Sequence, residues 1–396
     1  MHPELKKTTI IIKLFMRILY VIDSLASKGG AERIITEKMN YLANNYNYDV
    51  SVITCNQFPD TMKNRYELSD KVKQINLCIP THLQYRHKHP LRLLYKWKYY
   101  SMTRRKINRT AKELDPDIII GVGYVLANIV CRISCRASKV IESHEARPYT
   151  MSCHRFRSTP KILKMYYYLY RKYYLSIIER QADVVVALTK GDANEWYNAK
   201  RVEIIPNFST MPIKNISDCS NKRIIAVGRL EWQKGYDRLI KIWSIVSQKH
   251  PDWQLDIFGE GQLENELKSK IIEKGFRNIT IHPFTPNINE EYSKSSVCVL
   301  TSRFEGFALV LLEAMRHGVP CVTYDCKYGP SDVVDNNSCG YVVENGNIEV
   351  FAEKLCQLIE SPLKRKEYGR AAIIKSQAYN TDDIMDNWMK LFESLS

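Results

Sequence analysis

The sequence lacks an apolar run long enough to cross a membrane. Hydrophobic residues make up 45% of its 396 residues, yet no stretch approaches the roughly 20 consecutive apolar residues that a transmembrane helix requires. The sequence therefore predicts no membrane-spanning helix. Hydrophobic content of this size is typical of a folded protein and argues against disorder, and the length favours two domains over one.

The N-terminus has only some features of a signal peptide. Two lysines precede an apolar stretch over residues 8–15, but Lys13 and Arg17 interrupt it. A secretory signal carries a continuous apolar region between its charged start and its cleavage site. We therefore expect residues 1–15 to be a short extension rather than a cleaved signal, and Met16 is an alternative start.

The sequence also lacks paired cysteines. Its eleven cysteines are an odd number, and none forms a CxxC pair or has histidine partners at zinc spacing. Such scattered thiols are typical of a reduced, cytosolic protein. The pattern predicts no metal site.

The excess of positive charge is confined to the first half of the chain. Residues 1–210 hold 35 Lys and Arg against 18 Asp and Glu, a balance of +17, whereas the remainder holds 23 against 25, a balance of −2. Together these give the net charge of +15. We expect the first half to contact an anionic partner.

Two basic segments of the first half are rich in aromatic residues. Residues 82–109 carry nine Lys or Arg and no acid, with Trp97 among several tyrosines, and residues 161–180 carry six tyrosines among basic residues. An anionic membrane face fits this composition. A nucleic acid fits it through stacking and phosphate contacts, and two solvated helices with a buried tyrosine stripe also remain open. We favour the membrane surface and expect no nucleic acid.

Short apolar strands alternate with helical segments in both halves, which predicts parallel α/β sheets covered on both faces. The predicted strands are residues 17–22, 49–54, 72–77, 117–121, 139–142, 183–187 and 202–205, then 223–227, 253–258, 278–282, 297–301, 319–324 and 340–343. The predicted helices are residues 31–44, 91–113, 125–135, 160–180 and 191–197, then 236–246, 263–273, 308–316 and 350–359. The expected domains are residues 16–206 and 223–378, with a linker over 207–222 and a C-terminal helix over 379–396 that packs back on the first domain. Ligands should bind between two such domains, where the strands end.

The loops after the first strand of each half are suited to phosphate. Gly29 and Gly30 precede the helix that starts near residue 31 and allow close approach to its N-terminus, although no GxGxxG fingerprint is present. In the second half Arg229 and Lys234 share one loop, where they could neutralise a diphosphate. Ordinary turn glycines and solvated cations are the alternative interpretations.

Residues 303–315 contain two glutamates eight positions apart, Glu305 and Glu313. The helix that begins near residue 308 offers free backbone N–H groups in its first turn, which suits an anion. The carboxylates could then accept hydrogen bonds from neutral hydroxyls. An acidic loop followed by an ordinary core helix is the alternative.

Five motifs in order give the chain a resemblance to a known family. They are Gly29-Gly30-Ala31-Glu32, Ile205-Pro206-Asn207, Gly228-Arg229-Leu230 with Gln233-Lys234-Gly235, Phe258-Gly259-Glu260-Gly261, and residues 302–315 with the two glutamates. From residue 16 onward the chain resembles a retaining glycosyltransferase of family 4. The resemblance implies the GT-B fold, two Rossmann-like domains that face a central cleft. It also implies a nucleotide-sugar cosubstrate and no cofactor or metal.

The resemblance also assigns roles to residues. Arg229 and Lys234 would bind the donor diphosphate, Glu305 the donor sugar and Glu313 the ribose. The remaining expected donor-binding residues, some of them through backbone N–H groups, are Gly29, Gly30, Asn207, Gly228, Phe307, Ala308 and Leu309.

His144 matches the position at which the family places a histidine or aspartate near the anomeric carbon. It follows a predicted strand, and the neighbouring Glu145 is a second candidate. A structural histidine is the alternative. We therefore expect the catalytic set to be His144, Arg229, Lys234 and Glu305, with the donor's own phosphate as base in a same-face displacement.

Residues 327–334 resemble a variant found in family members that build bacterial surface polysaccharides, many of which use UDP-sugars. The expected activity is transfer of a hexose or N-acetylhexosamine from a UDP-sugar to a lipid-linked or polysaccharide acceptor. The expected place is the cytoplasmic face of the membrane, as a peripheral protein. A nucleotide-sugar 2-epimerase of the same two-domain plan and a non-enzymatic nucleic-acid-binding protein are the alternatives.

Overall fold

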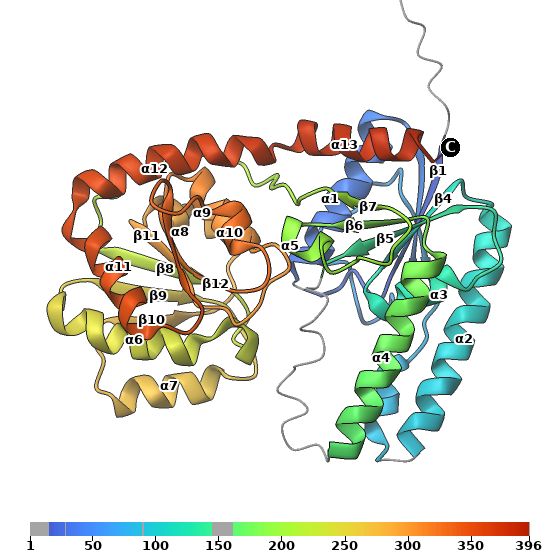
Figure 1. Cartoon of the computed structure of the whole chain (residues 1–396), viewed down its shortest axis with the longest axis horizontal. Coiled ribbons are helices and arrows are strands. Elements are labelled where there is room, and N and C mark those ends of the chain that lie inside the picture. Colours follow the sequence, from blue (N-terminus) through green and yellow to red (C-terminus); the bar gives the residue numbers. More distant parts are fainter. Residues whose placement is uncertain (1–15, 28, 89–90, 145–160, 396) are drawn as a thin grey trace, which may run out of the picture.

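The computed structural model describes residues 16–27, 29–88, 91–144 and 161–395, without the side chains of 161–163. It contains two sheets, and all their strand pairs are parallel. The expected fold class, two Rossmann-like domains in the GT-B arrangement, is confirmed. Figure 1 shows the two domains with their helices around each sheet.

The first domain has a seven-stranded sheet in the order β3-β2-β1-β4-β5-β6-β7. Its strands are β1 (Arg17–Ile22), β2 (Asp49–Thr54), β3 (Lys73–Asn76), β4 (Ile118–Val122), β5 (Ser138–Ser143), β6 (Val184–Ala187) and β7 (Val202–Ile204). Its helices are α1 (Gly30–Asn45), η1 (Thr81–Arg86), α2 (Leu91–Leu114), α3 (Tyr124–Cys131), α4 (Lys161–Gln181) and α5 (Lys190–Ala193).

The second domain has a six-stranded sheet in the order β10-β9-β8-β11-β12-β13. Its strands are β8 (Arg223–Val227), β9 (Gln254–Phe258), β10 (Ile279–His282), β11 (Val297–Leu300), β12 (Cys321–Asp325) and β13 (Gly340–Glu344). Its helices are η4 (Trp232–Lys234), α6 (Tyr236–Lys249), α7 (Glu264–Glu273), α8 (Ile288–Ser293), α9 (Leu309–Arg316), α10 (Pro330–Val333), α11 (Ile348–Glu360) and α12 (Pro362–Ser376), followed by η5 (Gln377–Tyr379) and α13 (Thr381–Glu393).

The alternation of side chains in β1 explains why the first sheet is buried on both faces. Tyr20 and its neighbours two positions away pack into one core, whereas Leu19 and Val21 pack into the core on the opposite face. Because both faces are covered, the strand is apolar throughout and does not alternate with polar residues.

The C-terminal helix α13 belongs to the first domain's core. Met385, Trp388 and Phe392 are buried among the side chains of β1. In Figure 1 α12 runs over the second domain and α13 continues over the first. The chain therefore crosses between the domains twice, once after β7 and once before α13.

Each predicted strand overlaps an observed one, but several helices differ. The helix expected over 125–135 ends at Cys131, and the one expected over 191–197 is the single turn of α5. The helix α12 was not predicted, although its start carries a recognisable signal: Ser361 caps it by accepting from the N–H of Lys364, and Pro362 follows. Its polar sequence hides the helical period.

The ten cysteines of the described segments are all free. In the same segments no helix is long and apolar enough to cross a bilayer.

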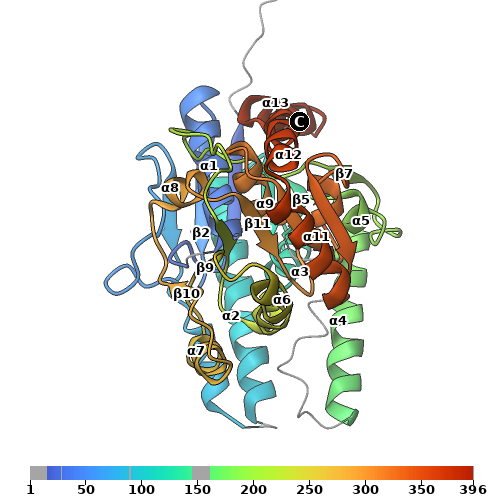
Figure 2. The same cartoon turned by 90° about the vertical axis from the view of Figure 1, so that its left-hand side faces the viewer.

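Figures 1 and 2 show that α2 and α4 extend below the rest of the first domain.

Candidate functional site

The two domains meet where α1 and α9 begin. A Cβ atom added to Gly30, the first residue of α1, would lie 3.1 Å from Cδ1 of Leu309, the first residue of α9. The absence of a side chain at Gly30 therefore allows the two helix N-termini to approach each other across the domain boundary. Gly29 is the N-cap residue of α1.

The start of α9 has an unusual backbone. Ala308, expected to be the first helical residue, is instead the N-cap residue and has the left-handed angles φ 59° and ψ 53°. Within the described residues, the backbone N–H groups of Phe307, Ala308 and Leu309 donate no hydrogen bond. Gly329 lies against this turn, since an added Cβ would be 2.9 Å from Cα of Phe307.

Lys234 and Glu305 meet in the second domain. Lys234 Nζ lies 2.7 Å from Glu305 Oε1, and the two side chains are only 14% and 7% exposed. Ser302 donates to the same carboxylate oxygen. The backbone of Glu305 is held by Lys327 and Tyr328, since its N–H donates to the carbonyl of Lys327 and its carbonyl accepts from the N–H of Tyr328. The lysine and the glutamate that were expected to share one site are therefore paired there.

Arg229 lies at the edge of this pair. Its side chain is 57% exposed, and Nη1 lies 3.3 Å from Glu231. Gly228 has φ 153°, and a Cβ there would be 3.2 Å from Cε of Lys234 and from the hydroxyl oxygen of Tyr236. The glycine lets the lysine side chain lie across the loop, whereas Arg229 is largely exposed and paired with Glu231.

Glu313 is engaged by a residue that the sequence did not predict for the site. Arg33 of α1 donates to Oε1 of Glu313, and the hydroxyl of Tyr292 donates to Oε2 at 3.1 Å. Glu313 is only 4% exposed. Burial acts to lower the pKa of Arg33, but the Glu313 carboxylate more than offsets this and the pKa is raised. An ion pair thus joins the two domains at the carboxylate expected to hold ribose. The only sequence signal for Arg33 was its position directly after the Gly-Gly-Ala-Glu motif.

His144 follows β5 and is held by a buried carboxylate. Its Nε2 lies 2.7 Å from Oε2 of Glu142, which also accepts from Nζ of Lys38 on α1. Burial acts to raise the pKa of Glu142, but Lys38 and His144 lower it to about 2. Burial also lowers the pKa of Lys38. The cost of burying this cation offsets part of the stability that the lowered pKa of Glu142 indicates. The ring of Trp388 lies 4.2 Å from Lys38 Nζ.

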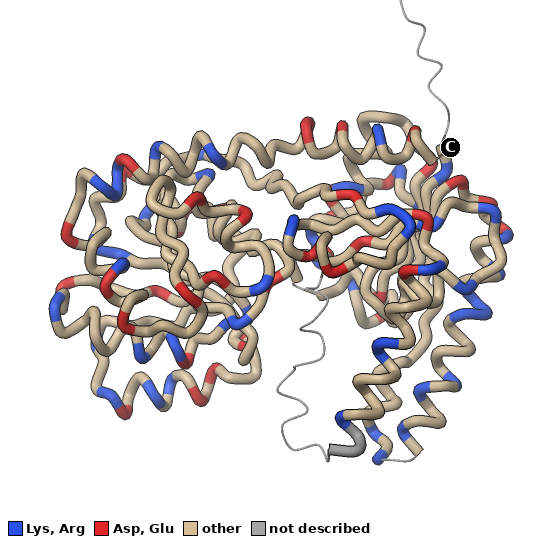
Figure 3. Tube along the Cα trace, in the orientation of Figure 1, with Lys and Arg blue, Asp and Glu red and all other residues tan. Residues whose placement is uncertain are grey.

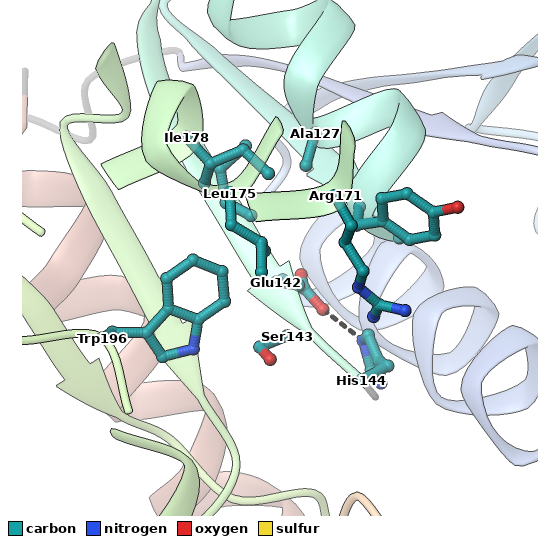
Figure 4. Close-up of a pocket in the computed structure, with 11 residues that line it drawn as sticks. Ala127, Glu142, Ser143, His144, Arg171, Leu175, Ile178 and Trp196 are labelled. Carbon is teal, nitrogen blue, oxygen red and sulfur yellow. Dashed lines mark hydrogen bonds and ion pairs between the residues drawn. The ribbon is translucent and has the colours of Figure 1, made fainter. Parts of the chain in front are cut away.

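A small cavity of about 30 Å³ adjoins His144. Figure 4 shows Glu142, His144 and Arg171 at one end of its lining and Trp196 at the other. This volume fits water and is far below the roughly 300 Å³ of a typical small-molecule pocket. A nucleotide would therefore have to bind outside this cavity.

Two further sequence predictions have no contact that assigns a role. Asn207 is buried at 5% exposure near the start of the predicted linker. Glu145 lies outside the described residues. Among those that are described, His250, Cys356 and Glu360 form a trio of potential metal ligands whose ligand atoms lie within 4.8 Å of one another. His250 follows the C-terminal end of α6, about 20 Å along the helix from Lys234, so this trio is not part of the site.

Two family descriptions match successive parts of the chain. Residues 28–208 match Glycosyltransferase Family 4, and residues 209–375 match Glycosyl transferases group 1. The boundary between the two matches falls after the last strand of the first sheet.

Two relatives and one solved structure illustrate the similarity. The chain is 29% identical over 388 residues to the amylovoran biosynthesis glycosyltransferase AmsD of Erwinia amylovora, covering 94% of this chain and 98% of the relative. It is 31% identical over 211 residues to a poly(ribitol-phosphate) alpha-N-acetylglucosaminyltransferase of Staphylococcus aureus, covering 50% of this chain and 42% of the relative. The crystal structure of a mutant of S. aureus TarM with fondaparinux, alpha-GlcNAc-glycerol and UDP superposes with a TM-score of 0.74 at 17% identity, covering 95% of this chain and all of that one.

Proposed function

The chain belongs to family 4 of the retaining glycosyltransferases, and we propose that it transfers a hexose or N-acetylhexosamine from a UDP-sugar to a lipid-linked or surface-polysaccharide acceptor. The proposed place of action is the cytoplasmic face of the membrane, where the protein is peripherally bound. The observation that carries the donor assignment is the Lys234–Glu305 pair next to the turn that starts α9.

The donor diphosphate is proposed to bind between this pair and the start of α9. The N–H groups of Phe307, Ala308 and Leu309 and the cation of Lys234 would all face growing negative charge as the sugar–phosphate bond breaks. Preorganised donors and cations of this kind supply the largest electrostatic contribution to many group transfers. Arg229 is 57% exposed and would exchange its contact with Glu231 for the diphosphate.

Glu305 is proposed to accept hydrogen bonds from hydroxyls of the donor sugar. Its carboxylate is already held by Lys234 and Ser302, so it is fixed in place before the donor arrives. A carboxylate that is held by a lysine is a poor nucleophile. This favours the same-face displacement, in which the acceptor hydroxyl attacks from the side of the departing diphosphate and that phosphate takes the proton.

His144 is proposed to face the sugar from the first domain. Because Glu142 is ionised at neutral pH, Nε2 of His144 carries the proton that it donates to this carboxylate. In the tautomer with its proton on Nε2, the ring presents Nδ1 as an acceptor for a substrate hydroxyl. Glu142 and Lys38 act on the reaction only through the orientation of this ring.

The relatives support the choice of donor and acceptor class. The TarM structure contains UDP, and the S. aureus relative is named as an N-acetylglucosaminyltransferase that acts on a polymer. The Erwinia relative, which matches almost end to end, is named for amylovoran biosynthesis. The same donor base and an acceptor of this kind are therefore proposed for this chain.

The test is a thermal-shift screen of the full chain against UDP-, GDP-, ADP- and dTDP-sugars, followed by product analysis by NMR. One UDP-sugar should raise the melting temperature, and its turnover with acceptor should keep the anomeric configuration. Lys234→Met should lower kcat by on the order of 100-fold or more, whereas Lys241→Met, an exposed position on α6, should leave it unchanged. Failure of every nucleotide sugar to bind would refute the proposal, and release of a free 2-epimer without acceptor would show an epimerase instead.

A further inference from the structure

The N-terminal halves of α2 and α4 extend beyond the first domain's core. No side chain is buried in the first eight residues of α2, nor between residues 164 and 170 of α4. Figures 1 and 2 show both helices running past the sheet in the same direction, with their first turns at the lower edge of the molecule. About 12 Å of α2 thus carries no buried side chain, given the 1.5 Å rise per residue.

Exposed apolar side chains gather on these two helix ends. Of the sixteen large hydrophobic residues that are exposed in the described part of the chain, nine lie on η1, α2 and α4. Six of the nine form what we call the helix-tip surface: Leu91, Leu94, Trp97, Met165, Tyr168 and Leu169, all at least half exposed. Single exposed apolar residues are ordinary, but a concentration of them marks an interaction site.

The charges around the helix-tip surface are all positive. No Asp or Glu occurs between residues 71 and 112 or between residues 161 and 178. Figure 3 shows only Lys and Arg on the projecting parts of α2 and α4. Lys98 and Lys164 are exposed there, and Arg104, Arg105 and Lys172 are exposed further along the same helices. The partner of this surface must therefore be anionic as well as apolar.

The inner faces of the two helices are packed against each other. Nζ of Lys96 on α2 lies 3.8 Å from the ring centroid of Tyr170 on α4, and the rings of Tyr100 and Tyr174 are 5.7 Å apart. A buried tyrosine stripe therefore exists, as one interpretation of the sequence predicted. It explains these tyrosines but not the leucines, the methionine and the tryptophan that point outward.

We propose that the helix-tip surface docks on an anionic lipid bilayer. Its apolar side chains lie at the boundary of headgroups and acyl chains, and the surrounding cations contact lipid phosphates. A single-stranded nucleic acid would use the cations and the rings in a groove, but it offers nothing for exposed leucine and methionine to bury against. The surface is built on two helix ends, and its aliphatic side chains favour lipid.

This proposal rests on the proposed function and deepens it, because it names the surface that brings the enzyme to a lipid-linked acceptor. The helix α4 connects the helix-tip surface with the cavity beside His144. Met165 is at its exposed end, and Arg171, six residues later, lines the cavity beside His144. The rise of an α-helix places these two positions only about 9 Å apart along the axis. An acceptor anchored in the bilayer would thus lie close to the first-domain side of the site.

The test is co-sedimentation of the full chain with vesicles of phosphatidylcholine alone and of phosphatidylcholine mixed with phosphatidylglycerol, without any nucleotide. The parent should bind only the anionic vesicles, and salt should weaken binding. The double variant Leu94→Asp, Trp97→Asp should bind the anionic vesicles more weakly by a factor of about ten or more. The control variant Ile272→Asp, Leu363→Asp changes two residues that are even more exposed, on α7 and α12, and should bind as the parent does.

Tryptophan fluorescence gives an independent readout. Of the six tryptophans, Trp97 is the only one that is mostly exposed, at 71%. Its emission should shift to the blue on anionic vesicles, and Trp97→Phe should bind vesicles but lose the shift. Trp232→Phe should keep it.

Equal vesicle binding by the Leu94, Trp97 double variant and the parent would overturn the proposal. So would parent binding that does not depend on phosphatidylglycerol, or binding to single-stranded nucleic acid but not to vesicles. The melting-temperature rise caused by a UDP-sugar separates the two proposals: a chain that binds anionic vesicles through this surface but no nucleotide sugar refutes the proposed function and leaves the docking surface in place. A chain that binds a UDP-sugar but no anionic vesicles refutes only the docking surface.

Discussion

The substitution Glu313→Gln tests the ribose assignment most directly. It keeps the shape of the side chain and removes its charge. In the structure Oε1 of Glu313 accepts from Arg33 and Oε2 accepts from Tyr292. A glutamine can keep a hydrogen bond to each, since its oxygen accepts from the arginine and its amide group donates to the tyrosine oxygen. What is lost is the ionic contact to Arg33 and the charged acceptor for the ribose hydroxyls.

Two magnitudes follow from this geometry. Arg33 is 16% exposed, and removal of the partner charge of a buried ion pair costs about 3 kcal/mol or more. A hydrogen bond to a charged group contributes about 1.5–3 kcal/mol, which corresponds to a preference of about 10- to 150-fold for UDP over 2′-deoxy-UDP. The parent should show this preference, and Glu313→Gln should lose most of it.

The assay is isothermal titration of the parent and the variant with UDP and with 2′-deoxy-UDP, alongside urea denaturation. Glu37→Gln is the matched control. Glu37 lies 3.8 Å from Arg33 and is 19% exposed, so it belongs to the same charge cluster. That control should lower the unfolding free energy less and leave the preference for UDP intact.

Two results would refute the reasoning. If Glu313→Gln is less stable but still prefers UDP as strongly as the parent, Glu313 is only a bridge between the domains. If the parent itself does not distinguish UDP from 2′-deoxy-UDP, no protein group at this position holds the 2′-hydroxyl.

Three further predictions concern the fold around the site. Glu142 has a pKa of about 2, below its ordinary 4.5, so its contribution to stability is present above pH 4.5 and is lost as the pH falls through 2; melting temperatures measured over this range should fall less steeply for Glu142→Gln. Gly329→Ala places a Cβ at φ 115° and 2.9 Å from Cα of Phe307, so it should reduce the unfolding free energy by about 1–3 kcal/mol, and unchanged urea midpoints would contradict this. Gly30→Val places bulk against Leu309 across the domain boundary, so kcat should fall in steady-state assays while the melting temperature changes little.

The fold was predictable because its signals are local. A strand such as β6, whose four residues are all buried, reads as a continuous apolar segment. Thirteen short strands in the described residues, most of them separated by helices, leave few arrangements other than two parallel sheets. The candidate donor residues were also predictable, since Lys234 and Glu305 belong to short motifs at strand ends, and their pairing is a consequence of parallel strands ending at one edge.

The partners of the site residues could not be read from the sequence. Arg33 and Glu313 are 280 positions apart, and Lys38 and Glu142 are 104 apart. In the sequence Arg33 and Lys38 look like ordinary exposed cations of an amphipathic helix. Their partners become visible only when the second domain and the end of β5 pack against that helix. A carboxylate that is buried needs a compensating charge, but only the packing shows which cation supplies it.

The sequence by itself determined the two sheets, the phosphate-suited loops and the basic, aromatic character of two helices, because each depends on residues within about one strand or helix of one another. The tertiary structure decided that the apolar side chains of the helix-tip surface on α2 and α4 face outward beyond the core rather than into it. It also decided that Glu313 is tied to Arg33 and that α13 completes the first domain's core. These features depend on which surfaces are brought together, and burial and charge compensation are properties of the assembled domains.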